Sequence, residues 1–451
     1  MQLASRSDQT ESIGALSLRP TRVRWHVVAL LAVIAGLTYI DRLNFGIAGK
    51  YIQDEFRLND QSMGFVLGAF SLGYAIFHVP GGWLGDRFGP RRILALAILW
   101  WSLFTAATVI GPRVSVAAGF SLAWSFGATR FLMGLGEAAA MPVAVKAITY
   151  WLGDKERGLG TSIFLAGVGA GNIFAPFLIT WMARQWGWRA SFELCGLIGA
   201  LVAAVWYVYT TDRPQEHTRI NGAELALILG PGGREEQHSD AKDSCTPWGK
   251  IFSNVSLWAL MLSHFCLVYP VYIFFTWFFI YLVRVRGLSM AAVGVWGSTP
   301  FIAGTVMVPL WGWLSDHRVQ SLGKRRGRRD TVWLGVVCSA TLLFSGSHTA
   351  NNRLAILQLA AAAGFNLAAS AILYTTCSDI TRRYSGSVSG AMATFGSLGG
   401  SASPVLTALI ATKFGWTPAL DFAAVVTVVS GIAWWFIDAS RSIDAQLGLP
   451  T

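Results

Sequence analysis

Long apolar segments separated by short polar ones recur along the whole chain. Each is about 20 residues long, which is the length that an α-helix needs to cross the hydrocarbon of a bilayer. There are twelve of them, and we expect an all-α membrane protein with twelve transmembrane helices. They cover 27–48, 63–84, 93–111, 120–142, 159–181, 192–210, 257–282, 290–312, 331–347, 354–376, 387–411 and 419–437.

The second half of the chain repeats features of the first at an offset of 228 residues. Gly187 and Trp188 fall on Gly415 and Trp416, and each pair follows a helix that contains a proline. The sequence GWLGDR after the second apolar segment returns as GWLSDH after the eighth. A repeat of this kind predicts two halves of six helices each. The expected parts are a disordered tail 1–24, a first half 25–210, a polar linker 211–250, a second half 251–438 and a tail 439–451.

Basic residues lie mostly in alternate loops. The tails, the linker and the loops on their side of the membrane carry 24 Lys and Arg, whereas the opposite loops carry 9. Because positive charge stays on the cytoplasmic side, we expect both termini and the linker there. The formal net charge is +11, and its densest run, 324–329, lies in one of these loops. We therefore interpret the basic character as a topology signal beside anionic lipid and expect no nucleic-acid partner.

Motifs for cofactors and catalysis are not found in the sequence. The five cysteines have no paired spacing, so neither a disulfide nor a zinc site is predicted. There is no phosphate-binding loop and no catalytic constellation. We therefore expect no enzyme, no metal and no cofactor, with transport driven by an ion gradient.

Four charged side chains lie inside predicted helices: Asp41 and Arg42 in the first, and Arg130 and Glu137 in the fourth. A charge at the bilayer centre costs about 2.5 to 3.5 kcal/mol on insertion scales, so each one indicates a function by default. A spacing of seven puts Arg130 and Glu137 on one helix face. The second half has uncharged residues at the corresponding positions, so the charges are not part of the repeated scaffold.

Two interpretations of these charges remain open. Asp41 with Arg42, or Arg130 with Glu137, would be neutralised pairs that hold helices together. Alternatively, Arg42 or Arg130 binds the carboxylate of a substrate, because a guanidinium stays charged and presents a planar fork. Asp41 and Glu137 then take up protons, and Glu137 pairs with Arg130 only when no substrate is bound. The second interpretation predicts proton-coupled symport of a small organic anion.

Two groups of motifs resemble known transporters. The segment after the second helix is similar to the signature of the major facilitator superfamily, and it contains Gly82, Asp86, Arg87, Gly89, Arg91 and Arg92. Tyr39-x-Asp41-Arg42-x-Asn44, Tyr74-x-x-x-His78 and Arg130-x-x-x-Gly134-x-x-Glu137 resemble the anion:cation symporter family within it.

The resemblance implies the major facilitator fold and secondary active transport by alternating access in the inner (plasma) membrane. It also implies that this signature belongs to the cytoplasmic gate. The partial repeat of the signature after the eighth apolar segment, which contains Asp316, belongs to the same gate. By the same likeness, Asp41 and Glu137 match protonated acids, and Arg42, Arg130, Tyr39 and Tyr74 match substrate-side positions.

Several positions bear on which anion fits. His78 stands where the family often has Gln, and it binds substrate, titrates or forms a hydrogen bond inside the bundle. Asn172 is a candidate amide, while Tyr269, Tyr272 and Trp277 make the second half aromatic. The expected substrates are a sugar acid, a dicarboxylate or an aromatic carboxylate. Because the predicted site has few amides and many aromatic rings, the aromatic carboxylate is favoured.

Alternatives to symport come from the same fold. The chain would then be a drug:proton antiporter or a transporter-like membrane sensor. An antiporter of that kind typically has Gly-Pro-x-x-Gly-Gly in the fifth helix, where this chain has Gly-Ala-Gly-Asn-Ile-Phe. We expect a functional monomer, and the sequence leaves open whether protons or sodium ions are coupled.

Overall fold

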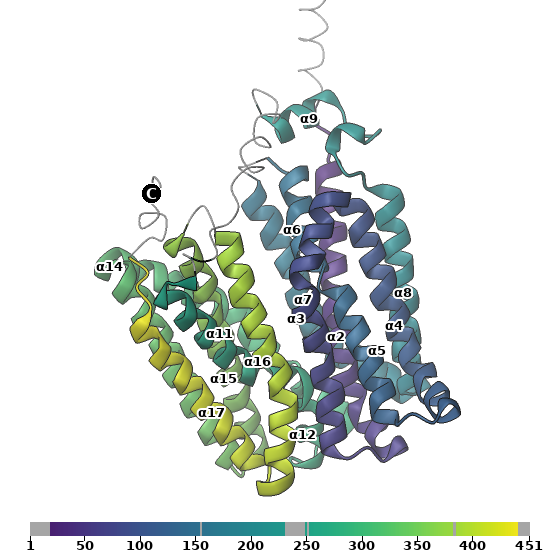
Figure 1. The fold of residues 1–451 in the computed structure, drawn as a ribbon, viewed down its shortest axis with the longest axis vertical. Coiled ribbons are helices and arrows are strands. Elements are labelled where there is room, and N and C mark those ends of the chain that lie inside the picture. The colour runs from purple at the N-terminus through teal and green to yellow at the C-terminus, as the bar shows by residue number, and fades with distance from the viewer. Residues whose placement is uncertain (1–18, 154–155, 231–248, 250–251, 382–384, 441–451) are drawn as a thin grey trace, which may run out of the picture.

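The structure is a computed structural model that describes residues 19–153, 156–230, 249, 252–381 and 385–440. The regular structure of these residues is helical throughout. Figure 1 shows two bundles side by side, one from each half of the chain. The first contains α2 (Val23–Phe56), α3 (Asp60–Phe88), α4 (Pro90–Ala118), α5 (Leu122–Glu137), α6 (Ala140–Trp151), α7 (Arg157–Trp186) and α8 (Trp188–Tyr209). The second contains α11 (Val255–Thr276), α12 (Phe278–Arg284), α13 (Met290–Trp296), α14 (Thr299–His348), α15 (Asn352–Ile380), α16 (Ser385–Phe414) and α17 (Trp416–Ala433).

Eleven helical segments of the described chain are long and apolar enough to cross a membrane. The longest, Met290–His348, has 59 residues, far more than one crossing needs. It is interrupted at Gly323, whose φ of 78° is not helical. This segment therefore accounts for the eighth and ninth of the twelve predicted spans, and the all-helical membrane fold expected from the sequence is confirmed.

The sequence repeat has a counterpart in the backbone. Helices α7 and α8 are joined by the single residue Gly187, and α16 and α17 are joined in the same way by Gly415. Both glycines have positive φ, 84° and 94°, a conformation that side-chain-bearing residues rarely adopt. The bounds of α7 and α16 and the starts of α8 and α17 are related by the offset of 228 residues.

The linker contains a short helix, α9 (Gly222–Leu229), that contacts the start of α2. The buried Glu224 accepts hydrogen bonds from the backbone N–H groups of Val23 and Arg24, at 3.2 and 3.0 Å. Arg24 in turn forms ion pairs with Glu224 and Glu156, both shorter than 3 Å. A carboxylate suits a helix N-terminus because the first N–H groups have no partner within the helix.

This contact changes the expected picture of the tail. Its last residues, from 19 to 24, are held by the linker, and α2 begins at Val23. The rest of both tails, residues 1–18 and 441–451, and residues 231–248 of the linker lie outside the described residues.

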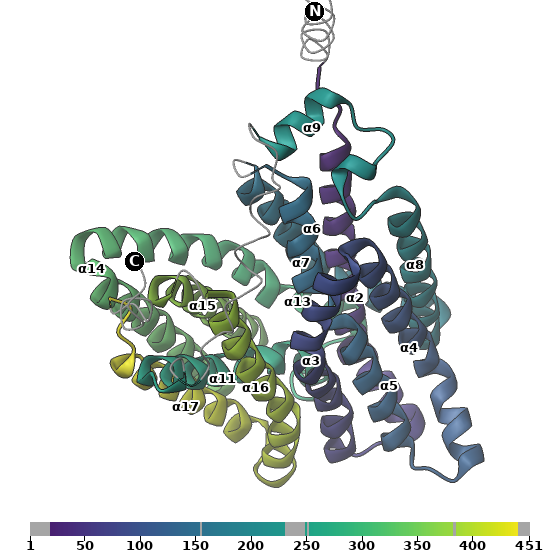
Figure 2. The same ribbon diagram turned by 45° about the horizontal axis from the view of Figure 1, so that its top comes forward.

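The two bundles meet at the end opposite α9 and diverge toward it (Figure 1), and they remain distinct when the molecule is turned (Figure 2). A Cβ on Gly46 of α2 would lie 2.6 Å from the carbonyl oxygen of Phe275 in α11. A Cβ on Gly64 of α3 would lie 2.7 Å from the carbonyl oxygen of Pro404 in α16. The backbones of the two halves are therefore in close contact on this side.

An ion pair also joins the halves at this end. Arg284 at the end of α12 binds Asp60 at the start of α3, with 2.6 Å between Nη1 and Oδ1. Under the alternating access that the resemblance to known transporters implies, reversing one charge, in Arg284→Glu, should weaken closure at this end and slow transport about fivefold, since a partly exposed ion pair contributes up to about 1 kcal/mol. Initial uptake rates measure the effect.

The charge swap is the matched test of this pair. Asp60→Arg combined with Arg284→Glu should restore most of the rate, whereas Arg353→Glu, at an exposed site in the first turn of α15, should not change it. Equal rates for the single and double variants would show that the pair does not contribute to closure.

Candidate functional site

The four charged residues predicted inside helices form one buried group, which we call the charge cluster: Asp41 and Arg42 on α2, Arg130 and Glu137 on α5. Asp41, Arg130 and Glu137 are 1%, 2% and 0% exposed. Arg42 is slightly more open, with 10% of its side chain exposed. Burial of this extent makes each unpaired charge expensive, so the partners of each group decide what the cluster can do.

Arg42 lies in a box of aromatic rings. The guanidinium carbon is 4.6 Å from the ring centre of Tyr39, 4.9 Å from that of Tyr74 and 5.1 Å from that of Phe70. Tyr39 is one helical turn from Arg42 on α2, and Phe70 and Tyr74 are one turn apart on α3. Ring faces attract a cation, so they hold the guanidinium in place while its N–H groups remain available to an anion.

Glu137 is the anion that Arg42 binds in this structure. Both Nε, at 2.9 Å, and Nη2 of Arg42 donate to the same oxygen, Oε1. The other oxygen, Oε2, is buried and has no partner among the described residues. The structure therefore differs from the predicted pairing of Glu137 with Arg130 and from the two structural pairs considered above: it pairs Glu137 with Arg42.

Arg130 does not pair with Glu137 because its side chain is directed elsewhere. It points to Met133, with Nη1 3.2 Å from the sulfur atom, and its guanidinium carbon is 4.7 Å from the ring centre of Phe70. Its Nε has no partner among the described residues. Arg130 and Arg42 thus both contact the ring of Phe70, and only Arg42 has a carboxylate bound.

Asp41 faces a different side of α2, next to Trp101 of α4 and Cys195 of α8. Neither of its oxygens forms a hydrogen bond with a described residue, nor does the indole nitrogen of Trp101. A buried carboxylate without donors is costly in its charged form, whereas the neutral acid is much less so. Asp41 does not share the aromatic box of Arg42.

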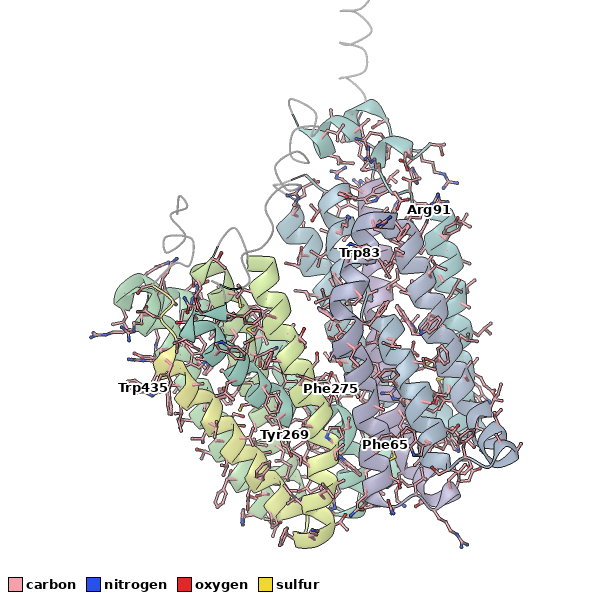
Figure 3. The ribbon with its side chains drawn as sticks, in the orientation of Figure 1. Phe65, Trp83, Arg91, Tyr269, Phe275 and Trp435 are labelled. Atoms are coloured by element: carbon pink, nitrogen blue, oxygen red, sulfur yellow. The ribbon has the colours of Figure 1, made fainter. Side chains whose placement is uncertain are left out.

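Phe275 and Tyr272, both on α11 of the second half, lie beside this box. The ring of Tyr272 is 5.8 Å from that of Phe275, which in turn is 6.2 Å from that of Tyr39. In Figure 3, Phe275 lies where the two bundles meet. Tyr272 is also close enough to Arg42 for an electrostatic interaction. The contact joins the two halves at the charge cluster.

Tyr269 and Trp277, which were also predicted to line the site from the seventh helix, do not lie at the charge cluster. Tyr269 is buried inside the second bundle, where its hydroxyl is 3.2 Å from that of Thr407 (Figure 3). Trp277 is fully buried and donates to the carbonyl oxygen of Pro404 at 3.0 Å. Both pack against helices of their own half, so the structure does not bring them to the charge cluster.

His78 lies beside the aromatic box of Arg42, and Asn172 lies on α7. The ring of His78 is 5.3 Å from that of Tyr74, one turn earlier on α3, and its Nδ1 has no partner among the described residues. Asn172 on α7 is half-buried, and its side-chain oxygen likewise has none. His78 is also within hydrogen-bonding reach of the backbone of Ala138, directly after α5.

A polar stripe on α15, made of Asn366, Ser370 and Tyr374, was missed by the sequence analysis. Asn366 and the hydroxyl of Ser370 are buried without a partner among the described residues. The hydroxyl of Tyr374 is 3.4 Å from Nε2 of His264 on α11, and Tyr374 lies within electrostatic range of Tyr39. The spacing of four between the three residues was the available signal, because it places them on one helix face.

The signature segment lies at the α9 end of the first bundle. Gly89 ends α3 with a φ of 87°, and the carboxylate of Asp212 fills the space where its Cβ would be. Asp212 accepts from the backbone N–H of Arg91 at 2.9 Å, so it caps the start of α4. Gly82 lies beside Pro142 of α6, Arg87 lies over the ring of Trp83, and Arg92 is exposed. The side chain of Asp86 is outside the described part of the chain.

The second copy of the signature forms a network of its own. Arg328 donates to Asp316 at 2.7 Å and to Asp379 at 3.0 Å. Lys324 also pairs with Asp379 at 3.0 Å. These contacts join the two parts of α14 to the end of α15, within one half of the molecule.

Comparison with known proteins gives the context for this site. Residues 31–404 match the family model described as "Major Facilitator Superfamily". The chain is 31% identical over 408 residues to the probable galactarate/D-glucarate transporter of Bacillus subtilis, covering 88% of each chain. It is 27% identical to the probable sulfoacetate transporter of Cupriavidus necator, covering 94% of this chain and 96% of that one.

Solved structures show the same fold. A bacterial homolog of the human lysosomal transporter Spinster, in an inward-facing and unoccupied conformation, has a TM-score of 0.76 at 18% identity, covering 93% of this chain and 97% of that one. A D-xylose-proton symporter has a TM-score of 0.71 at 15% identity, covering 92% and 98%. The family and these relatives are transporters and not enzymes. The chain therefore belongs to the Major Facilitator Superfamily and is a multi-pass membrane transporter whose relatives carry organic acids.

Proposed function

We propose that this protein is a proton-coupled symporter that takes up a small organic anion across the cytoplasmic membrane. The observation that carries the proposal is the composition of the charge cluster, with two guanidiniums and two carboxyl groups buried together. Its relatives include probable transporters of galactarate, D-glucarate and sulfoacetate, which supports an organic anion as the substrate.

The charge balance of the cluster couples binding of the organic anion to binding of protons. With Asp41 and Glu137 ionised, two negative charges offset Arg42 and Arg130. Each proton taken up leaves one excess positive charge, which is costly in a buried site until an anion arrives. Substrate and proton therefore favour each other's binding, which is the reciprocal coupling that symport requires.

Glu137 is the exchangeable partner in this mechanism. It occupies Nε and Nη2 of Arg42 in the free site. When Glu137 takes up a proton, its hold on the guanidinium weakens, and the carboxylate of the substrate takes its place in the planar fork. Asp41, which lies beside Trp101, is the second proton site.

Alternating access follows from the way the halves meet. They are in contact at the end opposite the linker and diverge toward the linker (Figure 1). Because basic residues gather on the linker side, that side is cytoplasmic and this conformation faces inward. Rocking of one half against the other, with the close contacts at Gly46 and Gly64 opening, exposes the cluster to the outside.

Unpartnered polar groups on α15 and α7 support a substrate class. The unpartnered polar atoms of Asn366, Ser370 and Asn172 suit hydroxyl groups, since buried polar atoms are normally hydrogen-bonded. Tyr269 and Trp277, which favoured an aromatic acid at the level of sequence, pack away from the cluster. We infer that the substrate is a hydroxylated acid of the sugar-acid type.

Uptake into proteoliposomes tests the proposal. Aldarates, aldonates, sulfonates and aromatic carboxylates are offered with the outside one pH unit more acidic than the lumen. A hydroxylated acid should accumulate about tenfold for each proton carried, because one pH unit corresponds to a factor of ten. A protonophore should abolish the accumulation. Equal uptake with and without the gradient would contradict proton coupling.

Tyr272 and Tyr269 form a matched pair for testing the site's boundary. Tyr272→Phe should raise KM about five- to tenfold, because the variant loses a hydroxyl within electrostatic range of Arg42, and a hydrogen bond to the substrate contributes about 0.5 to 1.5 kcal/mol. Tyr269→Phe should leave KM unchanged and lower thermal stability slightly, since its hydroxyl bonds Thr407 within the bundle. The reverse outcome would place the substrate on the other face of α11.

A further inference from the structure

A hollow of about 650 Å³ lies outside the charge cluster, at the end of α8 nearest the linker. One wall is the apolar surface of α8, including Val205 and Val208. The other wall is the linker segment that follows, including Glu216, Thr218 and Arg219. The hollow therefore has an apolar side formed by a membrane-spanning helix and a polar side formed by the segment beyond it.

The apolar side continues along α8 in the direction of the membrane. Leu201, Val205 and Val208 are exposed, and Val208 is 80% exposed. Their spacing of four and three places them on one face of the helix. This stripe of exposed apolar side chains leads from the hollow into the bilayer region, as the track of an acyl chain would.

The polar side carries one charge of each sign. Arg219 and Glu216 both line the hollow, and neither forms an ion pair with another residue in the described parts of the chain. Their backbone is fixed by the buried residue between them: Nε2 of His217 lies 3.0 Å from the carbonyl oxygen of Tyr209, and its ring packs against Trp151. Two opposite charges are thus held at the rim of the same hollow without neutralising each other.

We propose that this hollow is a binding site for a phospholipid with an aminoethyl headgroup from the cytoplasmic leaflet. The phosphate binds the guanidinium of Arg219 and the hydroxyl of Thr218, and the ammonium donates to the carboxylate of Glu216. One acyl chain lies along Leu201, Val205 and Val208. A zwitterionic headgroup complements both unpaired charges, whereas an anionic headgroup would leave Glu216 unsatisfied.

Native mass spectrometry of the delipidated full-length protein tests the site. The probes are phosphatidylethanolamine, phosphatidylcholine and phosphatidylglycerol with identical acyl chains, and glycerophosphoethanolamine without chains. The tightest bound lipid should be phosphatidylethanolamine, about five- to tenfold tighter than phosphatidylcholine, whose quaternary ammonium cannot donate to Glu216. Equal affinity for these two lipids, or equally tight binding of the headgroup alone, would overturn the proposal.

Variants locate the lipid. Arg219→Ala should remove the tightest site for all three lipids, and Glu216→Gln should remove only the preference for phosphatidylethanolamine over phosphatidylcholine. Arg213→Ala, an exposed cation of the same segment that does not line the hollow, and Glu193→Gln, an exposed acid of α8, are the controls. Unchanged binding in both test variants would refute the assignment.

A measurement on the unmodified protein removes any dependence on how the variants fold. A phosphatidylethanolamine with a photoreactive group on its acyl chain should label the peptide that contains Val205 and Val208. Labelling confined to other helices would exclude the proposed track.

Discussion

Arg42→Ala is expected to reduce uptake in proteoliposomes to the level of empty vesicles and to weaken substrate binding about 100-fold. Charge-assisted hydrogen bonds contribute about 1.5 to 3 kcal/mol each, and a factor of ten corresponds to about 1.4 kcal/mol. Arg42 is the guanidinium whose N–H groups already hold a carboxylate, that of Glu137. Substrate affinity is measured by calorimetry and uptake by radiolabel.

Arg42→Lys separates charge from geometry. It keeps the positive charge and loses the planar fork, so it should retain weak binding. Arg353→Ala, an exposed cation of the second half, is the control and should behave as the wild type. Full activity in Arg42→Ala with preserved thermal stability would contradict the role of Arg42 in binding.

Glu137→Gln is expected to abolish accumulation while leaving exchange of substrate intact. The amide resembles the protonated acid, so Arg42 stays free for the anion, but no proton can be taken up or released at this position. With one pH unit imposed, the wild type should accumulate substrate about tenfold per proton, and the variant should only equilibrate it. Counterflow of labelled substrate measures exchange separately.

Asp41→Asn and Glu193→Gln complete this comparison. Asp41→Asn should lower accumulation in the same way if both acids carry protons, whereas Glu193→Gln, an exposed acid in the first turns of α8, should change nothing. Loss of both exchange and accumulation in Glu137→Gln would indicate that Glu137 is needed for binding itself.

The sequence is sufficient to predict the fold because its signals are local. Apolar length, the asymmetry of basic loops and the recurrence of Gly187 as Gly415 all depend on a single helix or on one turn. The four charged residues were also found in this way, since a charge within an apolar segment is conspicuous wherever it lies.

The partners of those charges depend on how helices pack, which their spacing does not specify. Arg130 and Glu137 share a helix face, yet Glu137 pairs with Arg42 of another helix because Arg130 turns toward Met133 and Phe70. Likewise, Tyr269 and Tyr272 are neighbours on α11, but one packs inside its bundle and the other faces the charge cluster. Neutral polar residues such as Asn366 and Ser370 were missed because one amide or hydroxyl in an apolar helix is common.

The most direct test of proton-coupled transport is to record the protons that enter with the substrate. Proteoliposomes contain a trapped pH indicator, with the membrane potential clamped by potassium and valinomycin and the pH initially equal on both sides. Adding the substrate outside should acidify the lumen in wild-type vesicles in proportion to labelled substrate taken up, and should have no such effect in Glu137→Gln vesicles. Entry of labelled substrate into wild-type vesicles without any change of lumen pH would contradict proton symport.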